Sequence, residues 1–144
     1  MELAQHTRMD GAHAGATHAA IDGDPRVARI LRCIEAQLDD PSLGCELLQK
    51  TFFVSRPTLY RMFQPLGGVS RYIRERRLLA ARRRLRDEPQ HSITWLLYDL
   101  GFESERQFQR AFNARFGMSP THWRGLCKHG PQATQMRARV QATA

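Results

Sequence analysis

Apolar residues recur at helical spacing along most of the chain. A first run begins at Pro25 and keeps apolar residues three or four positions apart as far as Leu38, where Asp39-Asp40-Pro41 interrupts it. Such spacing predicts an amphipathic helix with one buried face. No segment alternates apolar and polar residues in the manner of a half-buried strand. The pattern therefore predicts an all-α fold.

Proline, glycine and serine divide the rest of the chain into further short helices. A second helix is expected from about Gly44. A third runs from Arg56 to about Gln64, with Ser55 as its N-cap. A longer fourth helix extends from Ser70 to about Arg86. The remaining helices are expected at about 93–100 after Ser92, at 105–116 between Ser104 and Gly117, and from Ser119-Pro120 onward.

This order contains the same unit twice, at about 44–64 and about 93–116: a short helix, a tight turn and a serine-capped helix. In a helix-turn-helix, the second helix enters the major groove of DNA. Two such helices read one face of a duplex when they lie about one turn, ~34 Å, apart. We expect the helix at about 70–86 to set that separation. One chain would then place two helices on the same face of DNA, as a dimer usually does.

The charge of the chain favours a polyanionic partner. The formal net charge is +8 at pH 7, and residues 55–86 alone hold ten arginines against one acid, Glu75. A solvated helical face would place acids four residues from bases, so we interpret these arginines as phosphate contacts rather than intrahelical pairs. Those flanking the first recognition helix are favoured for DNA. An acidic partner such as RNA polymerase is an alternative for those on the far face of the joining helix.

Other classes of protein have little support in the sequence. Three cysteines are odd in number and never form a C-x-x-C pair, so neither a disulfide framework nor a metal site is predicted. Histidines 6, 13 and 18 lie in an Ala/Gly-rich tract, where no fixed metal geometry is expected. No nucleophile has a paired base. We therefore expect no enzyme activity and no cofactor.

The two ends of the chain lack periodicity. Residues 1–24 and 129–144 are predicted as disordered tails around a DNA-binding domain at 25–128, with no small-molecule effector domain in this chain. No run approaches the ~18 apolar residues of a membrane span, and no secretory signal opens the chain. A cytoplasmic protein without a membrane partner is expected.

The second unit resembles the C-terminal DNA-binding domain of the AraC/XylS family of bacterial transcription regulators. The residues that carry the resemblance there are Gly101-Phe102-Glu103-Ser104, Phe108, Arg110, Phe112, Phe116-Gly117-Met118-Ser119-Pro120 and Trp123-Arg124. The first unit and the joining helix match through Val54-Ser55, Leu59-Tyr60-Arg61, Phe63, Tyr72-Ile73, Arg76-Arg77-Leu78, Ala81 and Leu85. The resemblance covers roughly residues 27–125.

This resemblance implies seven helices of homeodomain-like architecture, with the third and sixth as recognition helices and the fourth as joining helix. The expected DNA-binding residues are Arg56, Thr58, Tyr60 and Arg61 on the first recognition helix, and Ser104, Glu105, Arg106, Gln107 and Arg110 at the second. Arginine can bond guanine, glutamine adenine, and glutamate the cytosine amine. Two alternatives stay open: Arg61 and Arg110 contact phosphate only, and Glu105 serves only as a favourable first-turn charge.

Seven aromatic side chains are predicted to form core rather than to stack on bases. They are Phe52, Phe53, Phe102, Phe108, Phe112, Phe116 and Trp123. The family usually has glycine where this chain has Phe53, and a small alanine where it has Gln49 and Leu97. We expect this bulk to affect the placement of the recognition helices more than the fold.

The leading hypothesis is a transcription regulator that binds two adjacent major grooves of promoter double-stranded DNA as one module. One alternative is sequence-independent DNA packaging by the basic surface. Another is the DNA-binding remnant of a longer effector-responsive regulator. A sequence preference over random duplex separates the regulator from the packaging protein.

Overall fold

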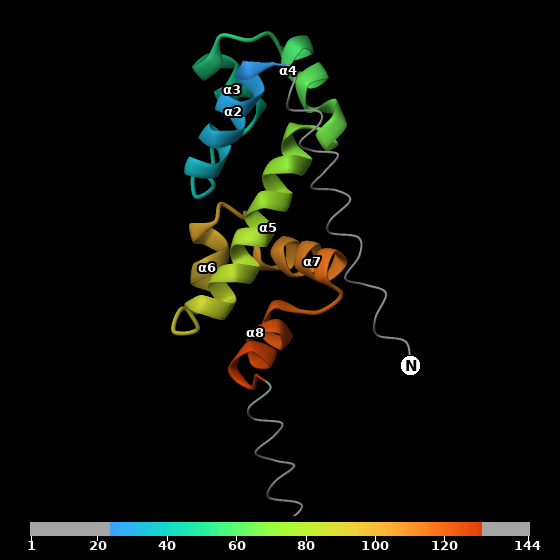
Figure 1. Ribbon diagram of the computed structural model, residues 1–144. Helices are drawn as coiled ribbons and strands as arrows, with labels where there is room; N and C mark the ends of the chain where they lie inside the picture. The colour runs from blue at the N-terminus through green and yellow to red at the C-terminus, as the bar shows by residue number, and fades with distance from the viewer. Residues whose placement is uncertain (1–23, 131–144) are drawn as a thin grey trace, which may run out of the picture. The chain divides into compact units, whose positions relative to one another are not determined.

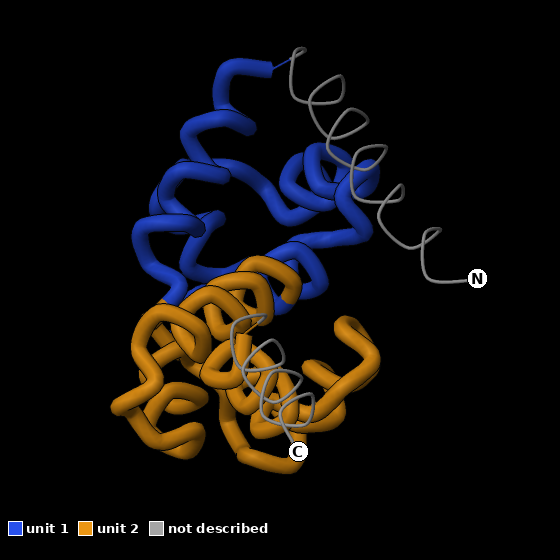
Figure 2. Tube along the Cα trace, turned by 60° about the horizontal axis from the view of Figure 1, so that its bottom comes forward, with its two compact units in different colours: residues 1–38, 42–74 blue, residues 39–41, 75–144 orange. Residues whose placement is uncertain are grey.

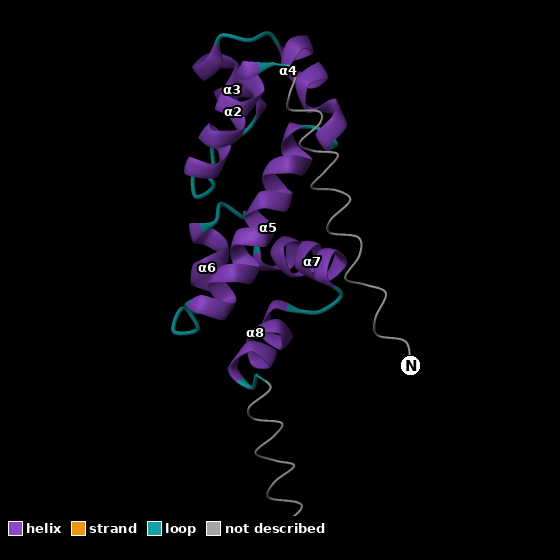
Figure 3. Ribbon diagram, viewed as in Figure 1, coloured by secondary structure: helices purple, strands orange, loops and turns teal. Residues whose placement is uncertain are grey.

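A computed structural model describes residues 24–130 of the 144-residue chain, and throughout this range the regular structure is helical (Figure 1). Within these residues no strand occurs, and short turns join the helices (Figure 3). The predicted all-α class is thereby confirmed. The predicted tails lie outside the described residues, apart from Asp24, His129 and Gly130, and the N-terminal histidines do so too.

Seven α-helices lie in the described part of the chain. They are α2 (Pro25–Ala36), α3 (Cys45–Phe52), α4 (Arg56–Phe63), α5 (Val69–Asp87), α6 (Ile93–Asp99), α7 (Glu105–Phe116) and α8 (Pro120–Lys128). A 3-10 turn at Gln64–Leu66 follows α4. Several predicted ends differ by one or two residues: α2 stops at Ala36 rather than Leu38, and α5 begins at Val69 rather than Ser70.

Serine side chains cap four of these helices, as the sequence predicts. In each case the serine Oγ accepts a hydrogen bond from the backbone N–H three residues later, which satisfies one of the free amides of the first turn. The pairs are Ser55 with Thr58, Ser92 with Trp95, Ser104 with Gln107, and Ser119 with His122. Each cap contributes roughly 1 kcal/mol, so the start of both predicted recognition helices is fixed locally.

The helices form two compact units (Figure 2). Among the described residues, the first unit comprises 24–38 and 42–74, and the second comprises 39–41 and 75–130. Helices α2, α3 and α4 belong to the first unit, and α6, α7 and α8 to the second. Helix α5 contributes residues 69–74 to the first unit and 75–87 to the second.

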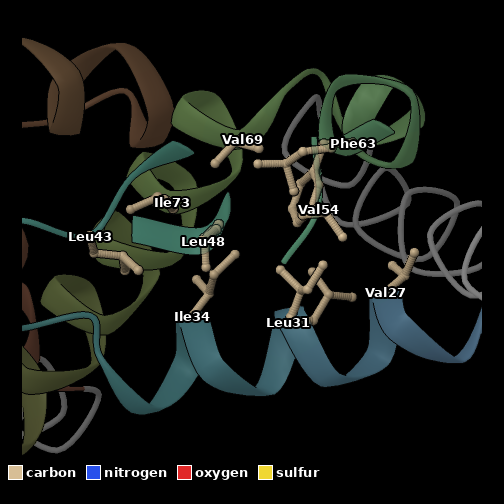
Figure 4. Packing of buried hydrophobic residues seen from close by; sticks show 11 residues of the cluster. Val27, Leu31, Ile34, Leu43, Leu48, Val54, Phe63, Val69 and Ile73 are labelled. Carbon is tan, nitrogen blue, oxygen red and sulfur yellow. The ribbon is translucent and has the colours of Figure 1, made fainter. Parts of the chain in front are cut away.

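The first unit is built on the inner faces of its three helices. Val27, Leu31 and Ile34 on α2 point toward the other buried side chains of the unit (Figure 4). The buried cluster consists of Val27, Ile30, Leu31, Ile34, Leu43, Leu48, Val54, Leu59, Phe63, Val69 and Ile73. Burial of one such side chain stabilises a fold by about 1.5–3 kcal/mol. Leu59 and Phe63 therefore hold α4 by its inner face.

The second unit has an aromatic core. Phe102, Phe108, Phe112 and Phe116 follow one another with ring centroids 4.9, 5.7 and 4.6 Å apart, a range in which aromatic pairs attract beyond their buried area. Phe108 and Phe112 are fully buried and hold α7 by its inner face. Leu97, where the family usually has alanine, is also fully buried, so its bulk fills the interior of this unit.

Phe53 contradicts the predicted core. Its side chain is 95% exposed, and its backbone adopts the left-handed conformation with φ 52° and ψ 43° at the end of α3. Within residues 24–130 it is the one non-glycine residue with positive φ. The turn into α4 needs this conformation, and there the Phe53 ring lies in solvent. A left-handed L-residue costs roughly 1–2 kcal/mol.

We therefore predict that Phe53→Gly leaves the free energy of unfolding unchanged or raises it by up to about 1 kcal/mol. Glycine relieves the left-handed cost, and its larger entropy in the unfolded chain offsets part of that gain. Urea denaturation followed by circular dichroism measures the difference. The matched control is Tyr60→Gly, which removes another exposed aromatic ring but from a helix interior and should cost about 0.5 kcal/mol. A clear loss of stability in the Phe53 variant would contradict the strain argument.

Candidate nucleic-acid interface

The first recognition helix, α4, presents a polar face to solvent. Arg56, Tyr60 and Arg61 are exposed, and Leu59 on the opposite side is buried. Thr58 is half-buried, and its Oγ1 lies 2.8 Å from the Oγ of Ser55. The hydroxyl of Thr58 is thus engaged within the cap, whereas the two guanidinium groups and the phenol of Tyr60 reach solvent.

Helix α7 of the second unit also presents a polar face to solvent. Glu105, Arg106, Gln107 and Arg110 are all exposed near its N-terminus, and Ser104 at the cap is exposed as well. The Ser104 Oγ accepts the Gln107 backbone N–H at 3.2 Å, which leaves the Gln107 side chain to solvent. This end of α7 carries positive, negative and amide groups side by side.

One exposed polar residue on α7 was not among the predicted site residues. Gln109 is exposed, and its Nε2 donates to Glu105 Oε1 at 2.9 Å. The sequence spacing of Glu105 and Gln109 predicts this contact, because residues four apart on a helix are neighbours. Glu105 also lies in the first turn, where a negative charge is favourable. Its carboxylate therefore already has local roles.

Four arginines on the two recognition helices are open to a ligand. Within residues 24–130 the guanidinium groups of Arg56, Arg61, Arg106 and Arg110 are exposed and have no hydrogen-bond or ion-pair partner. An exposed guanidinium presents five donors in a planar fork that matches phosphate or the edge of guanine. Each recognition helix thus offers one such fork in its first turn, from Arg56 or Arg106, and a second further along, from Arg61 or Arg110.

Some arginines of the segment 55–86 pair with acids of the protein itself, so fewer are available to a ligand than the composition predicts. Arg84 donates to Asp99 at 2.6 Å and to Glu88 at 3.4 Å, and Arg86 pairs with Asp87 at 2.7 Å. Burial lowers the pKa of Arg84, but its bonds to Asp99 and Glu88 outweigh this and raise it. The prediction that these arginines do not serve intrahelical pairing is therefore wrong for Arg84 and Arg86, which pair with Glu88 and Asp87 close by in the sequence. Asp87 and Glu88 lie just beyond residues 55–86, and Asp99 lies at the end of α6.

Arg82 and Arg84 also lie over aromatic rings of the second unit. The Arg82 guanidinium carbon is 4.7 Å from the ring centre of Trp123, and Trp123 Nε1 donates to the Arg82 carbonyl at 2.9 Å. Arg84 lies 5.2 Å from the ring centre of Trp95, which His91 covers by stacking at 4.0 Å. Such cation–π contacts contribute about 0.5–1 kcal/mol each at exposed sites. They help to hold the second unit together.

Arg77 supports the turn that leads into α7. This half-buried side chain donates from Nη2 to the Asp40 carbonyl at 2.7 Å and from Nη1 to the Gly101 carbonyl at 3.3 Å. Burial lowers the pKa of Arg77, and the charges of Asp40 and Asp39 oppose that effect. The guanidinium lies against Gly101, where a Cβ atom would approach it to 2.7 Å. All these residues belong to the second unit.

Five other arginines of the segment are exposed, namely Arg56, Arg61, Arg71, Arg74 and Arg83, whereas Arg76 is half-buried. Arg71 and Arg74 accompany Arg56 and Arg61 in the first unit, and Arg83 lies on the part of α5 that belongs to the second. In the described stretch, no helix is long and apolar enough to cross a membrane. Nor do any three His, Cys, Asp or Glu residues between 24 and 130 form a group able to hold a metal ion.

Known proteins resemble this chain in sequence. The helix-turn-helix domain family matches residues 48–125, more than half of the chain. Regulatory protein SoxS of Escherichia coli K12 is 34% identical over 100 residues, which cover 66% of this chain and 89% of SoxS. SoxS of Salmonella typhimurium is 31% identical over 100 residues, covering 68% of this chain and 92% of that protein.

Two further comparisons concern longer or solved proteins. The HTH-type transcriptional activator RhaS of Salmonella arizonae is 29% identical over 122 residues; the match covers 83% of this chain but 42% of RhaS. The C-terminal domain of AraT, a response regulator from Geobacillus stearothermophilus, superposes with a TM-score of 0.64 at 25% identity, covering 70% of this chain and 84% of that one.

The fold and the capped polar helices define a helix-turn-helix DNA-binding protein. With the family match and the SoxS relatives, the chain belongs to the AraC/XylS family. It is a transcription regulator that binds DNA through two helix-turn-helix motifs, and not an enzyme.

The geometry around Gly101 makes a testable prediction about the second unit. Gly101→Ala should lower the free energy of unfolding by about 1–2 kcal/mol, because the residue has φ 76° and a Cβ would displace Arg77. Thermal or urea denaturation measures the loss. As a control, Gly125→Ala in α8 places its Cβ in open space and should stabilise the protein by about 0.5–1 kcal/mol. Equal stability of the two variants would contradict the role given to Gly101.

Proposed function

We propose that one molecule of this regulator inserts α4 and α7 into two adjacent major grooves of the same promoter duplex. The observation that carries this proposal is the repeated local build of the two helices. Each begins at a serine cap, buries its inner face in the core of its own unit, and presents one free arginine in its first turn and a second one five or four residues further along. Helix-turn-helix proteins read bases with this end of the second helix.

The side chains divide into proposed base readers and backbone contacts. Arg56, Arg61, Arg106 and Arg110 suit guanine, and the Gln107 amide suits adenine. The hydroxyl groups of Tyr60 and Ser104 suit phosphate oxygens, which receive most protein hydrogen bonds to DNA. The Thr58 hydroxyl is left for phosphate only if DNA displaces it from Ser55. Glu105 is left for a cytosine amine only if DNA displaces Gln109 from it. We assign phosphate contacts to Arg71 and Arg74 beside α4.

The structure favours a regulator over a packaging protein. Packaging would need a broad, freely available basic surface, yet Arg77, Arg82, Arg84 and Arg86 have partners within the second unit. Exposed Arg83 is the arginine we propose for an acidic protein partner such as RNA polymerase. We propose the bacterial cytoplasm as the location of the protein, because promoter DNA lies there.

Two arginine variants distinguish base reading from phosphate contact. Arg110→Ala should cost about 1–3 kcal/mol on the preferred site and relax preference at one or two base pairs, because it removes a bidentate contact. Arg74→Ala should weaken binding to all duplexes alike and flatten the log–log salt dependence by about 0.9. The preferred site comes from selection out of a random DNA pool, followed by titration at several salt concentrations. Equal losses on every sequence for both variants would show that α7 does not read bases.

The two-groove proposal predicts the length and shape of the bound DNA. A single protein molecule should protect two consecutive major-groove segments. If the two helices lie closer than the ~34 Å turn of straight DNA, the duplex must curve toward the protein, at an elastic cost of order 1–6 kcal/mol. Footprinting and a circular-permutation gel-shift assay measure both properties. Protection of a single groove segment would refute the proposal and leave DNA binding intact, whereas mobility independent of site position would refute the bend.

A further inference from the structure

Phe53 lies at the edge of a small hollow in the first unit. Arg26, Arg29, Thr51 and Phe52 line this hollow together with Phe53, and we call it the Phe53 hollow. Its volume is about 240 Å³, below the ~300–1,000 Å³ typical of small-molecule sites. It is therefore better suited to part of a larger partner than to an enclosed ligand.

Neither packing nor backbone geometry accounts for phenylalanine at this position. The ring is 95% exposed, so it adds almost nothing to the core. The left-handed backbone favours glycine, and the corresponding turn of the second unit has Gly101 at φ 76°. A residue kept in an unfavourable conformation with its apolar side chain in solvent points to a function outside the fold.

The hollow is also positively charged. Arg26 and Arg29 are exposed one turn apart on α2. Asp24 holds the guanidinium of Arg26 at 2.9 Å, whereas Arg29 has no hydrogen-bond or ion-pair partner within residues 24–130. The Thr51 hydroxyl donates to the Leu47 carbonyl at 2.8 Å. The groups that the hollow offers a partner are therefore the free charge of Arg29 and the ring of Phe53.

We propose that the Phe53 hollow binds the sugar–phosphate strand that borders the groove entered by α4. Phe53 precedes Ser55, the N-cap of α4, by two residues, so a duplex that receives this helix must pass close to the hollow. A DNA strand alternates anionic phosphates with apolar deoxyribose faces. Arg29 suits the phosphate, and the phenyl ring offers an apolar face to the sugar.

This inference rests on the proposed insertion of α4 into DNA and adds a contact outside the recognition helices. The contact carries no sequence information, because it touches only the backbone. An acidic protein segment with an apolar side chain would match the same charges, but it would have to share this surface with the DNA that α4 engages. We therefore assign the surface to DNA.

Three variants of the full chain test the assignment, each titrated against the selected site and a random-sequence duplex of equal length. Arg29→Gln should weaken binding to both duplexes roughly three- to tenfold and flatten the salt dependence by about 0.9 for one lost phosphate contact. Phe53→Gly should weaken both duplexes to a similar extent without loss of thermal stability. Arg32→Gln, an exposed arginine on the same helix but outside the hollow, should bind as the parent does.

Phosphate ethylation interference gives a second readout. At least one phosphate whose ethylation blocks the parent should cease to matter for Arg29→Gln. Parent-like binding of both Arg29→Gln and Phe53→Gly to the two duplexes would overturn the proposal and leave the surface to an acidic protein partner. Failure of the two-groove proposal is recognised separately, because it appears in the footprint of the parent, whereas the Arg29 comparison needs only a duplex that α4 engages.

Discussion

Two pairs of buried side chains hold the recognition helices, and the polar surface depends on them. Leu59 and Phe63 anchor α4 in the first unit, and Phe108 and Phe112 anchor α7 in the second. Each unit is small, and a small chain segment buries a limited share of its surface. Loss of one large buried ring typically costs about 3–5 kcal/mol, a large part of the stability of such a fold. The orientation of the exposed polar groups on α4 and α7 therefore follows from these apolar contacts.

Arginine has two roles in this chain. In the second unit, Arg77 donates to backbone carbonyls, and Arg84 pairs with acids while lying over Trp95. These side chains add polar and cation–π contacts around the small apolar core of the second unit. The guanidinium groups of the recognition helices, such as those of Arg61 and Arg110, have no partner in the described residues. Some of the arginines that make the chain basic therefore stabilise the fold, although the basic composition as a whole indicates DNA binding.

The sequence predicts the features that arise from neighbouring residues. Serine caps and apolar stripes act over three or four positions, so Ser55, Ser104 and the inner faces of the helices were identified correctly. Three-dimensional neighbours were not. The partners of Arg77 lie 24 and 37 residues away, and no local pattern announces them. Phe53 was misassigned because an aromatic residue in a turn resembles core until its backbone conformation is known. The DNA contacts of the site residues remain predictions.

The placement of the indole rings has a spectroscopic consequence. The chain has two tryptophans, Trp95 and Trp123, and both belong to the second unit. Each lies beside an arginine, and Trp123 donates a hydrogen bond to the backbone of α5. Their emission thus reports the environment of one unit alone, while the far-ultraviolet circular dichroism records the helices of both. Differences between the two signals during denaturation would reveal whether the units unfold together or in turn.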